Sequence, residues 1–114
     1  MCIAIIGSRT LSIPDLGIYL PKDTTEIISG GAKGVDTSAR EYALAHHLPL
    51  TELRPDYRRY RKGAPLKRTI EIIERADFVL IFWDGISKGT RYAMEQCERL
   101  VVDYRVYLKY DMVI

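Results

Sequence analysis

Short apolar segments alternate with amphipathic segments of helical period along this chain. The run Cys2-Ile3-Ala4-Ile5-Ile6 is continuously apolar and ends at Gly7, a pattern typical of a strand buried on both faces of a parallel sheet. Five segments predict such strands, the third and fifth less strongly than the others: 2–6, 26–29, 50–53, 78–83 and 105–108.

Helices are predicted between these strands. Residues 12–20 fit a first helix capped by Ser12 and ended by Pro21, although Gly17 disfavours it. A second helix gathers several side chains on one face: Val35, Ala39, Tyr42, Ala43 and His46.

Two further helices follow the basic part of the chain. Pro65 suits the first turn of the third helix, whose apolar stripe consists of Leu66, Ile70 and Ile73. The fourth spans about 88–101 and is expected to turn a set of side chains inward: Tyr92, Cys97, Leu100 and Val101.

The order of these elements predicts the fold class. Alternating strands and helices without an internal repeat indicate parallel β-α-β units, and hence an α/β, doubly wound domain that covers residues 1–114. We expect a mainly parallel five-stranded sheet with helices on both faces. Such sheets bind ligands in the crevice at the carboxyl ends of the strands, where the strand order changes direction.

Three loops that follow predicted strands combine glycines, hydroxyls and cations. Glycines let backbone N–H groups approach a ligand, and the helix that follows adds free N–H groups and a positive dipole end, which together suit a phosphate. The candidate binding residues are Gly7, Ser8 and Arg9 in the first loop; Ser29, Gly30, Gly31, Lys33, Gly34 and Asp36 in the second; and Trp83, Asp84, Gly85, Ser87, Lys88, Gly89 and Thr90 in the third.

Alternatives remain open for these loops. Asp36 fits either a first-turn acid that stabilises its helix or an acceptor for a ribose hydroxyl, and Trp83 fits either the core or the stacking of a base. The glycines themselves fit plain turns. Neither the G-x-G-x-x-G fingerprint nor a P-loop is present.

The composition of the chain mainly excludes classes of protein and kinds of site. The chain has 114 residues, 47% of them hydrophobic and 28% charged, which is typical of one globular domain. No apolar run is long enough to span a membrane and no leader opens the chain, so we expect a cytoplasmic protein without a membrane partner. Cys2 and Cys97 are expected as reduced core residues, and the adjacent His46 and His47 predict no metal site; no cofactor is expected.

The formal charge of +2 is distributed unevenly along the chain. Residues 54–68 contain seven basic residues and one acidic residue, a charge of +6, which leaves −4 on the rest of the chain. This segment also carries Tyr57 and Tyr60 among its arginines. A local positive field attracts anions, so the near-neutral total does not exclude a phosphate ligand.

The set of motifs Gly-Ser-Arg, Ser-Gly-Gly-Ala-Lys-Gly-Val-Asp and Phe-Trp-Asp-Gly-x-Ser-Lys-Gly-Thr resembles the YspA-like branch of the SLOG superfamily. That superfamily also contains the DprA/Smf proteins and the lonely-guy phosphoribohydrolases. The resemblance covers residues 3–102 and implies a Rossmann-like sheet that binds a nucleotide or nucleotide-derived ligand at the three loops, in a sensor or processing role.

Resemblance to the lonely-guy hydrolases implies a role for Arg68, nine residues before Asp77, in catalysis or phosphate binding. Gly89-Thr90 matches their Gly-Thr pair, but Ala93 stands where their catalytic glutamate is expected. An N-glycosidic hydrolase would therefore need another carboxylate. Asp84 and Asp36 are the candidates.

Three functions follow as hypotheses. The first is a module that binds a nucleotide or its derivative; the second is a nucleotide N-glycosidic hydrolase. The third and weakest is a single-stranded DNA-binding protein, as among the DprA relatives, that uses the basic loop from Arg58 to Lys62. Relatives in this superfamily also commonly dimerise, so we expect a homodimer or a higher homo-oligomer.

Overall fold

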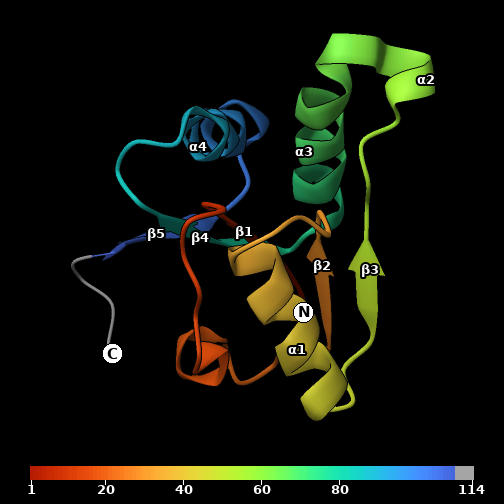
Figure 1. The fold of residues 1–114 in the computed structure, drawn as a ribbon. Helices are drawn as coiled ribbons and strands as arrows, with labels where there is room; N and C mark the ends of the chain where they lie inside the picture. The colour runs from red at the N-terminus through yellow and green to blue at the C-terminus, as the bar shows by residue number, and fades with distance from the viewer. Residues whose placement is uncertain (110–114) are drawn as a thin grey trace.

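The computed structural model describes residues 1–109 of the chain as one α/β unit (Figure 1). Its strands are β1 (Cys2–Gly7), β2 (Glu26–Ser29), β3 (Leu50–Glu52), β4 (Phe78–Trp83) and β5 (Tyr104–Leu108). Its helices are α1 (Val35–Ala45), α2 (Tyr57–Tyr60), α3 (Ala64–Arg75) and α4 (Lys88–Leu100), with 3₁₀ turns η1 (Leu16–Tyr19) and η2 (Arg61–Gly63). Within residues 1–109, no helix combines the length and the apolar character needed to cross a membrane.

All five strands are parallel and follow the order β3-β2-β1-β4-β5. In the centre, Ala4 of β1 pairs with Ile28 of β2 on one side and with Val79 of β4 on the other. The chain builds outward from β1 in one direction and then returns to build outward from β4 in the other. This order confirms the predicted doubly wound, Rossmann-like sheet and places its switch point between β1 and β4.

Helices cover both faces of the sheet, as predicted (Figure 1). The helix α1 closes one face over a core that includes Ile3, Ile5 and Phe82. The helices α3 and α4 close the other face over Ala4, Ile81 and neighbouring side chains. Because consecutive residues of a strand point to opposite faces, the continuous apolar runs of β1 and β4 supply both cores at once.

The predicted helix over residues 12–20 is wrong. The structure has only the short turn η1 there, preceded by Asp15, and Ser12 is exposed and caps nothing. Pro14 explains the difference, because a proline pushes the residue before it away from helical backbone angles. Ile13 instead donates its backbone N–H to Ser38 Oγ of α1 at 2.9 Å and packs into the core.

The inward faces of the helices also need correction. Val101 is 89% exposed with φ +56°, because it is the left-handed residue that ends α4 at Leu100. Leu66 is 44% exposed, and the buried stripe of α3 uses Ile72 beside the predicted Ile73. His46 lies exposed at the end of α1, where its ring stacks on Tyr42 with centroids 4.1 Å apart.

Both cysteines are free thiols, in agreement with the expectation that they are reduced. Cys97 is fully buried among the side chains beneath α4, and burial raises the pKa of its thiol to about 11. Cys2 is only partly buried, and its pKa is also raised, chiefly by burial. Thiols with raised pKa values are poor nucleophiles at neutral pH, as expected of packing residues.

Candidate functional site

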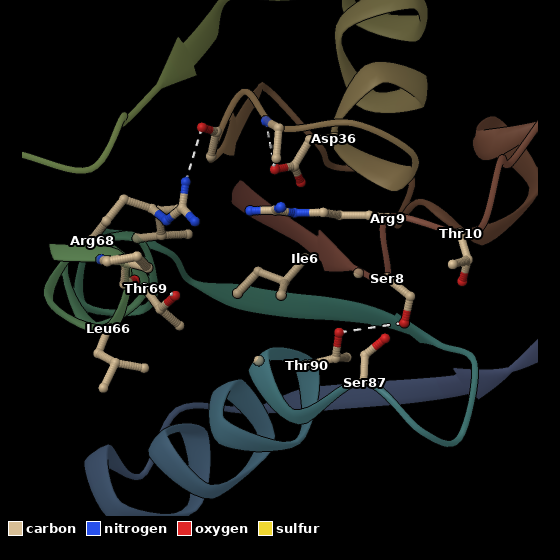
Figure 2. A pocket seen from close by; sticks show the side chains of 16 residues that line it. Ile6, Ser8, Arg9, Thr10, Asp36, Leu66, Arg68, Thr69, Ser87 and Thr90 are labelled. Atoms are coloured by element: carbon tan, nitrogen blue, oxygen red, sulfur yellow. Dashed lines mark hydrogen bonds between the residues drawn. The ribbon is translucent and has the colours of Figure 1, made fainter. Parts of the chain in front are cut away.

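A pocket of about 330 Å³ lies at the carboxyl edge of the sheet, at the switch point between β1 and β4. Loops after β1, β2 and β4 form three of its sides, and α3 forms the fourth (Figure 2). Its volume is at the lower end of the range for small-molecule sites. The pocket therefore occupies the position that the doubly wound topology predicts for a ligand.

About half of the sequence-predicted residues line this pocket. They are Gly7, Ser8, Arg9, Gly30, Asp36, Arg68, Ser87, Gly89 and Thr90. The others do not line it: Ser29, Gly31, Lys33, Gly34, Trp83, Asp84, Gly85 and Lys88. Both lysines are exposed and lie outside the lining, so the cations that face the pocket are arginines.

Asp36 fills the glycine loop that was predicted to hold a phosphate. Its Oδ2 accepts a hydrogen bond from the backbone N–H of Ala32 at 3.0 Å, four residues back. The side chain is almost buried, and burial raises its pKa, partly offset by this hydrogen bond and by the nearby Arg68. The loop thus already surrounds a carboxylate of its own, which makes it a poor place for a phosphate.

Arg68 connects three segments across the pocket wall. Its Nη1 donates to the carbonyl oxygens of Gly30 at 3.0 Å and of Leu53 at 3.4 Å. Burial lowers the pKa of its guanidinium, and the nearby Asp36 opposes that shift. The sequence resemblance implies a role in catalysis or phosphate binding, which stays a prediction; the contacts in the structure give Arg68 a positioning role.

Arg9 is the exposed cation of the pocket. Figure 2 shows its side chain reaching across the pocket toward Arg68, between Asp36 and Ile6. Its backbone packs against Gly34, where an added Cβ would lie 2.5 Å from the Arg9 carbonyl oxygen and φ is +72°. Gly34 therefore acts on the site by letting the first and second loops approach each other.

The first turn of α4 faces the same space. Its first intrahelical hydrogen bond runs from the N–H of Arg91 to the carbonyl of Ser87 at 3.2 Å, so the N–H groups of Lys88, Gly89 and Thr90 have no intrahelical acceptor. Unlike α1, this helix has no acidic side chain within its first turn, so the free N–H groups and the positive dipole end of that turn face the pocket.

Hydroxyl groups join the first loop to α4. Ser8 and Thr90 are both buried, and their hydroxyl oxygens lie 3.4 Å apart (Figure 2). Ser8 Oγ also accepts the backbone N–H of Asp84 at 3.1 Å. These contacts hold the loops after β1 and β4 at a fixed separation around the pocket.

The carboxylate of Asp84 is occupied by its own loop. It accepts hydrogen bonds from the backbone N–H groups of Ile86 and Ser87 and from the hydroxyls of Ser87 and Thr10, all between 2.8 and 2.9 Å. These bonds hold the pKa of Asp84 well below its usual range. Asp84 thus shapes the loop before α4 and lies outside the pocket lining.

Trp83 packs against the core and does not line the pocket. Its ring lies against the core beneath α3 and α4, and its Nε1 donates to the carbonyl of Ser87 at 3.0 Å. The guanidinium of Arg91 lies 5.7 Å from the ring centroid. Both contacts tie the end of β4 to the start of α4.

The sequence reasoning missed the α3 side of the pocket. Pro65, Leu66, Thr69 and Ile72 line it together with Arg68, and so do Ile6, Thr10 and Ala32 beside the predicted loop residues. Pro65 and Ile72 lie three and four residues from Arg68 and share its helix face. Once Arg68 is a candidate, this spacing identifies these two residues, whereas nothing in the spacing points to Leu66 and Thr69.

Comparisons of the chain with family models, with curated proteins and with solved structures find no match. The fold class is shown by the strand order.

Proposed function

We propose that the chain binds a nucleotide or a nucleotide-derived phosphate compound in this pocket, as a sensor or processing module. One observation carries the proposal: Arg9 and the free first turn of α4 face one pocket at the topological switch point. A guanidinium and a helix N-terminus are both strong phosphate-binding groups. The buried Asp36 is the one acidic residue among the pocket-lining side chains of the described chain.

The lining suggests how the ligand lies. Its phosphate takes the backbone N–H groups of Gly89 and Thr90 and the guanidinium of Arg9. Asp36 accepts a hydroxyl of the sugar, since carboxylates are strong acceptors. Apolar surface from Ile6, Leu66 and Ile72 contacts the base or its replacement.

A thermal-shift panel tests this proposal. The probes are AMP, NMN, NAD, ADP-ribose and cyclic dinucleotides at millimolar concentration. Binding at about 100 times Kd adds roughly 2.7 kcal/mol, which raises Tm by about 10 °C in a domain of this size. If none of these probes stabilises the protein, the proposal is wrong.

Arg9→Ala and Lys33→Ala form a matched pair for the same assay. Both remove an exposed cation from a loop at this edge of the sheet, but only Arg9 lines the pocket. We expect Arg9→Ala to weaken binding about tenfold or more and Lys33→Ala to leave it unchanged. Equal effects of the two substitutions would place the phosphate elsewhere.

Hydrolysis of a nucleotide N-glycosidic bond is the second candidate, and Asp36 is the observation that favours it. A buried carboxyl group with a raised pKa inside a pocket suits general acid–base work, whereas the carboxylate of Asp84 is fully occupied. Incubation with nucleoside monophosphates and chromatography of the free base tests it. We expect base release that Asp36→Asn abolishes; no release, or release that survives this substitution, excludes the mechanism.

A further inference from the structure

A cluster of exposed cations lies beside the pocket, on a segment without buried residues. We call residues 57–63, together with Lys67, the basic arm. Its cations are Arg58, Arg59, Arg61, Lys62 and Lys67, all of them exposed. Within residues 1–109, none of these five forms an ion pair. The adjacent Asp56 turns its carboxylate to the backbone N–H of Arg59, at 3.2 Å.

The basic arm contributes no side chain to the hydrophobic core. Neither α2 nor η2 contains a buried residue. The ring of Tyr60 lies near the guanidinium of Arg59, at 5.2 Å, and near the ammonium of Lys67, at 5.8 Å, so it holds these two cations in place. Tyr57 is 59% exposed and leaves an aromatic face open to solvent.

The arm and the pocket are continuous along α3. Figure 1 shows α2 and the start of α3 beyond the carboxyl ends of β2 and β3, the edge at which the pocket lies. In the first two turns of α3, Leu66 and Arg68 line the pocket, while Lys67 belongs to the arm. An anionic chain that leaves the pocket past the half-exposed Leu66 therefore meets Lys67 and then the other cations.

We propose that the ligand is an extended one, a nucleotide that carries further phosphate groups. Its first phosphate lies in the pocket and its further phosphates lie along the basic arm. This inference rests on the proposed function. A pocket of about 330 Å³ holds one nucleotide-sized portion, and unpaired cations along its rim match a row of phosphates. Tyr57 offers a stacking surface for a second base.

The shared chemistry is a row of phosphates, which two sources supply. One is a short single strand with phosphodiester bonds, and the other is a nucleoside polyphosphate with phosphoanhydride bonds. Calorimetric titrations compare AMP, GMP, CMP and UMP with the 5′-phosphorylated trinucleotide and the nucleoside 5′-tetraphosphate of the same base. The protein is the full chain, as wild type and as two triple variants.

The arm variant is Arg58→Gln, Arg61→Gln and Lys62→Gln, which leaves Arg59 and Lys67 on the Tyr60 ring. Its matched control is Lys22→Gln, Arg75→Gln and Arg99→Gln, which removes three exposed cations outside the arm and the pocket. Because no arm residue is buried, the arm variant should keep the wild-type circular dichroism and Tm. Both are measured first.

We expect wild type and control to bind one extended probe at least about tenfold more tightly than the mononucleotide of the same base. The arm variant should bind the extended probe and the mononucleotide with the same affinity. With three phosphate contacts, affinity for the extended probe should fall roughly 20-fold between 50 and 200 mM salt. The extended probe that binds more tightly identifies the source of the phosphates.

Other outcomes overturn the inference in distinguishable ways. If mononucleotides bind and extended probes bind no more tightly, the inference fails while the proposed function stands. If an extended probe binds but mononucleotides do not displace it, the arm is a separate site, as for an acidic protein partner. If no probe binds, the proposed function fails and this inference fails with it.

Discussion

The Nη1 of Arg68 donates a hydrogen bond to the carbonyl oxygen of Gly30 at 3.0 Å, across 38 positions of sequence. Gly30 follows β2, and Arg68 lies on α3, which leads into β4 on the other side of the switch point. The contact therefore connects the two halves of the doubly wound sheet at the edge where the pocket opens. It also explains why residue 30 is a glycine, since a Cβ there would overlap the guanidinium.

The first prediction concerns this contact. Arg68→Ala removes a hydrogen bond from a charged donor to a buried loop and should lower the free energy of unfolding by about 1 to 2 kcal/mol. Gly30→Ala should cost a similar amount, because the new methyl group displaces the same guanidinium. The double variant should then cost clearly less than the two single costs combined. Urea unfolding followed by circular dichroism measures all four proteins.

Additive costs in this cycle would contradict the contact. The loop after β2 would then be destabilised by the methyl group for a reason unrelated to Arg68. Arg68→Lys is a useful further control. It keeps the charge but not the planar donor, so it should recover only part of the lost free energy.

Gly34→Ala should be the more severe glycine substitution. At φ +72° and ψ −119° an alanine is strained, and its Cβ would collide with the backbone of Arg9, which cannot move aside as a side chain can. We expect a loss of about 2 kcal/mol or more, together with weaker nucleotide binding as Arg9 is displaced. Gly89→Ala is the matched control, since nothing lies within 4 Å of the added Cβ and stability should be unchanged or slightly higher. Equal losses from both would contradict the prediction.

Asp36 should give the protein a pH dependence of unusual sign for a carboxyl group. Its pKa is raised in the folded state, mainly by burial, so the folded protein holds this proton more tightly than the unfolded chain. Stability from this group is present at low pH and is lost as the pH rises from the unfolded value of about 3.9 through the folded pKa. The difference between wild type and Asp36→Asn in urea unfolding, taken from pH 3 to pH 7, isolates the effect. A difference that does not change with pH would show that the pKa is not raised.

Asp84 should behave in the opposite way. Hydrogen bonds to its carboxylate lower its pKa in the folded state, so its contribution is present at neutral pH and is lost as the pH falls below the unfolded value of about 3.9. Asp84→Asn should therefore destabilise the protein at pH 7 more than at pH 3. The same titration measures this, and a larger loss at pH 3 would refute it.

Ser29→Ala tests a candidate binding residue that lies outside the pocket. The hydroxyl oxygen of Ser29 is buried and has no hydrogen-bond partner within the described residues. A buried polar group without a partner is destabilising, so the alanine variant should be as stable as wild type or about 1 kcal/mol more stable. Nucleotide binding should not change. Loss of binding in this variant would return Ser29 to the site.

The fold was predictable because the strands are buried on both faces. The runs 2–6 and 78–83 leave no polar position for a solvent-facing side, which identifies a parallel sheet and, with it, the edge where ligands bind. The first part of the chain was mispredicted because Pro14 overrides the helical pattern around it. The end of α4 was mispredicted because Val101 adopts a left-handed conformation that its sequence does not suggest.

The site was only half predictable, for a different reason. Glycine loops after strands locate the pocket, but which side chain fills a loop depends on contacts made in three dimensions. The carboxylate of Asp36 accepts a hydrogen bond from the backbone N–H of Ala32, so the second loop surrounds a carboxylate of the chain itself. The short helix α2 had a local signal that was overlooked, namely Asp56 three residues before Arg59, in the position of a helix cap.

The carboxylate of Asp36 also bears on the entropy of ligand binding. A glycine-rich loop loses much conformational freedom when it becomes ordered around a ligand. Here Asp36 and Arg68 hold Gly30 and Ala32 in place before any ligand arrives. The loop is preorganised, so the free energy of the phosphate contacts made by Arg9 and α4 is available for affinity instead of being used to order the second loop.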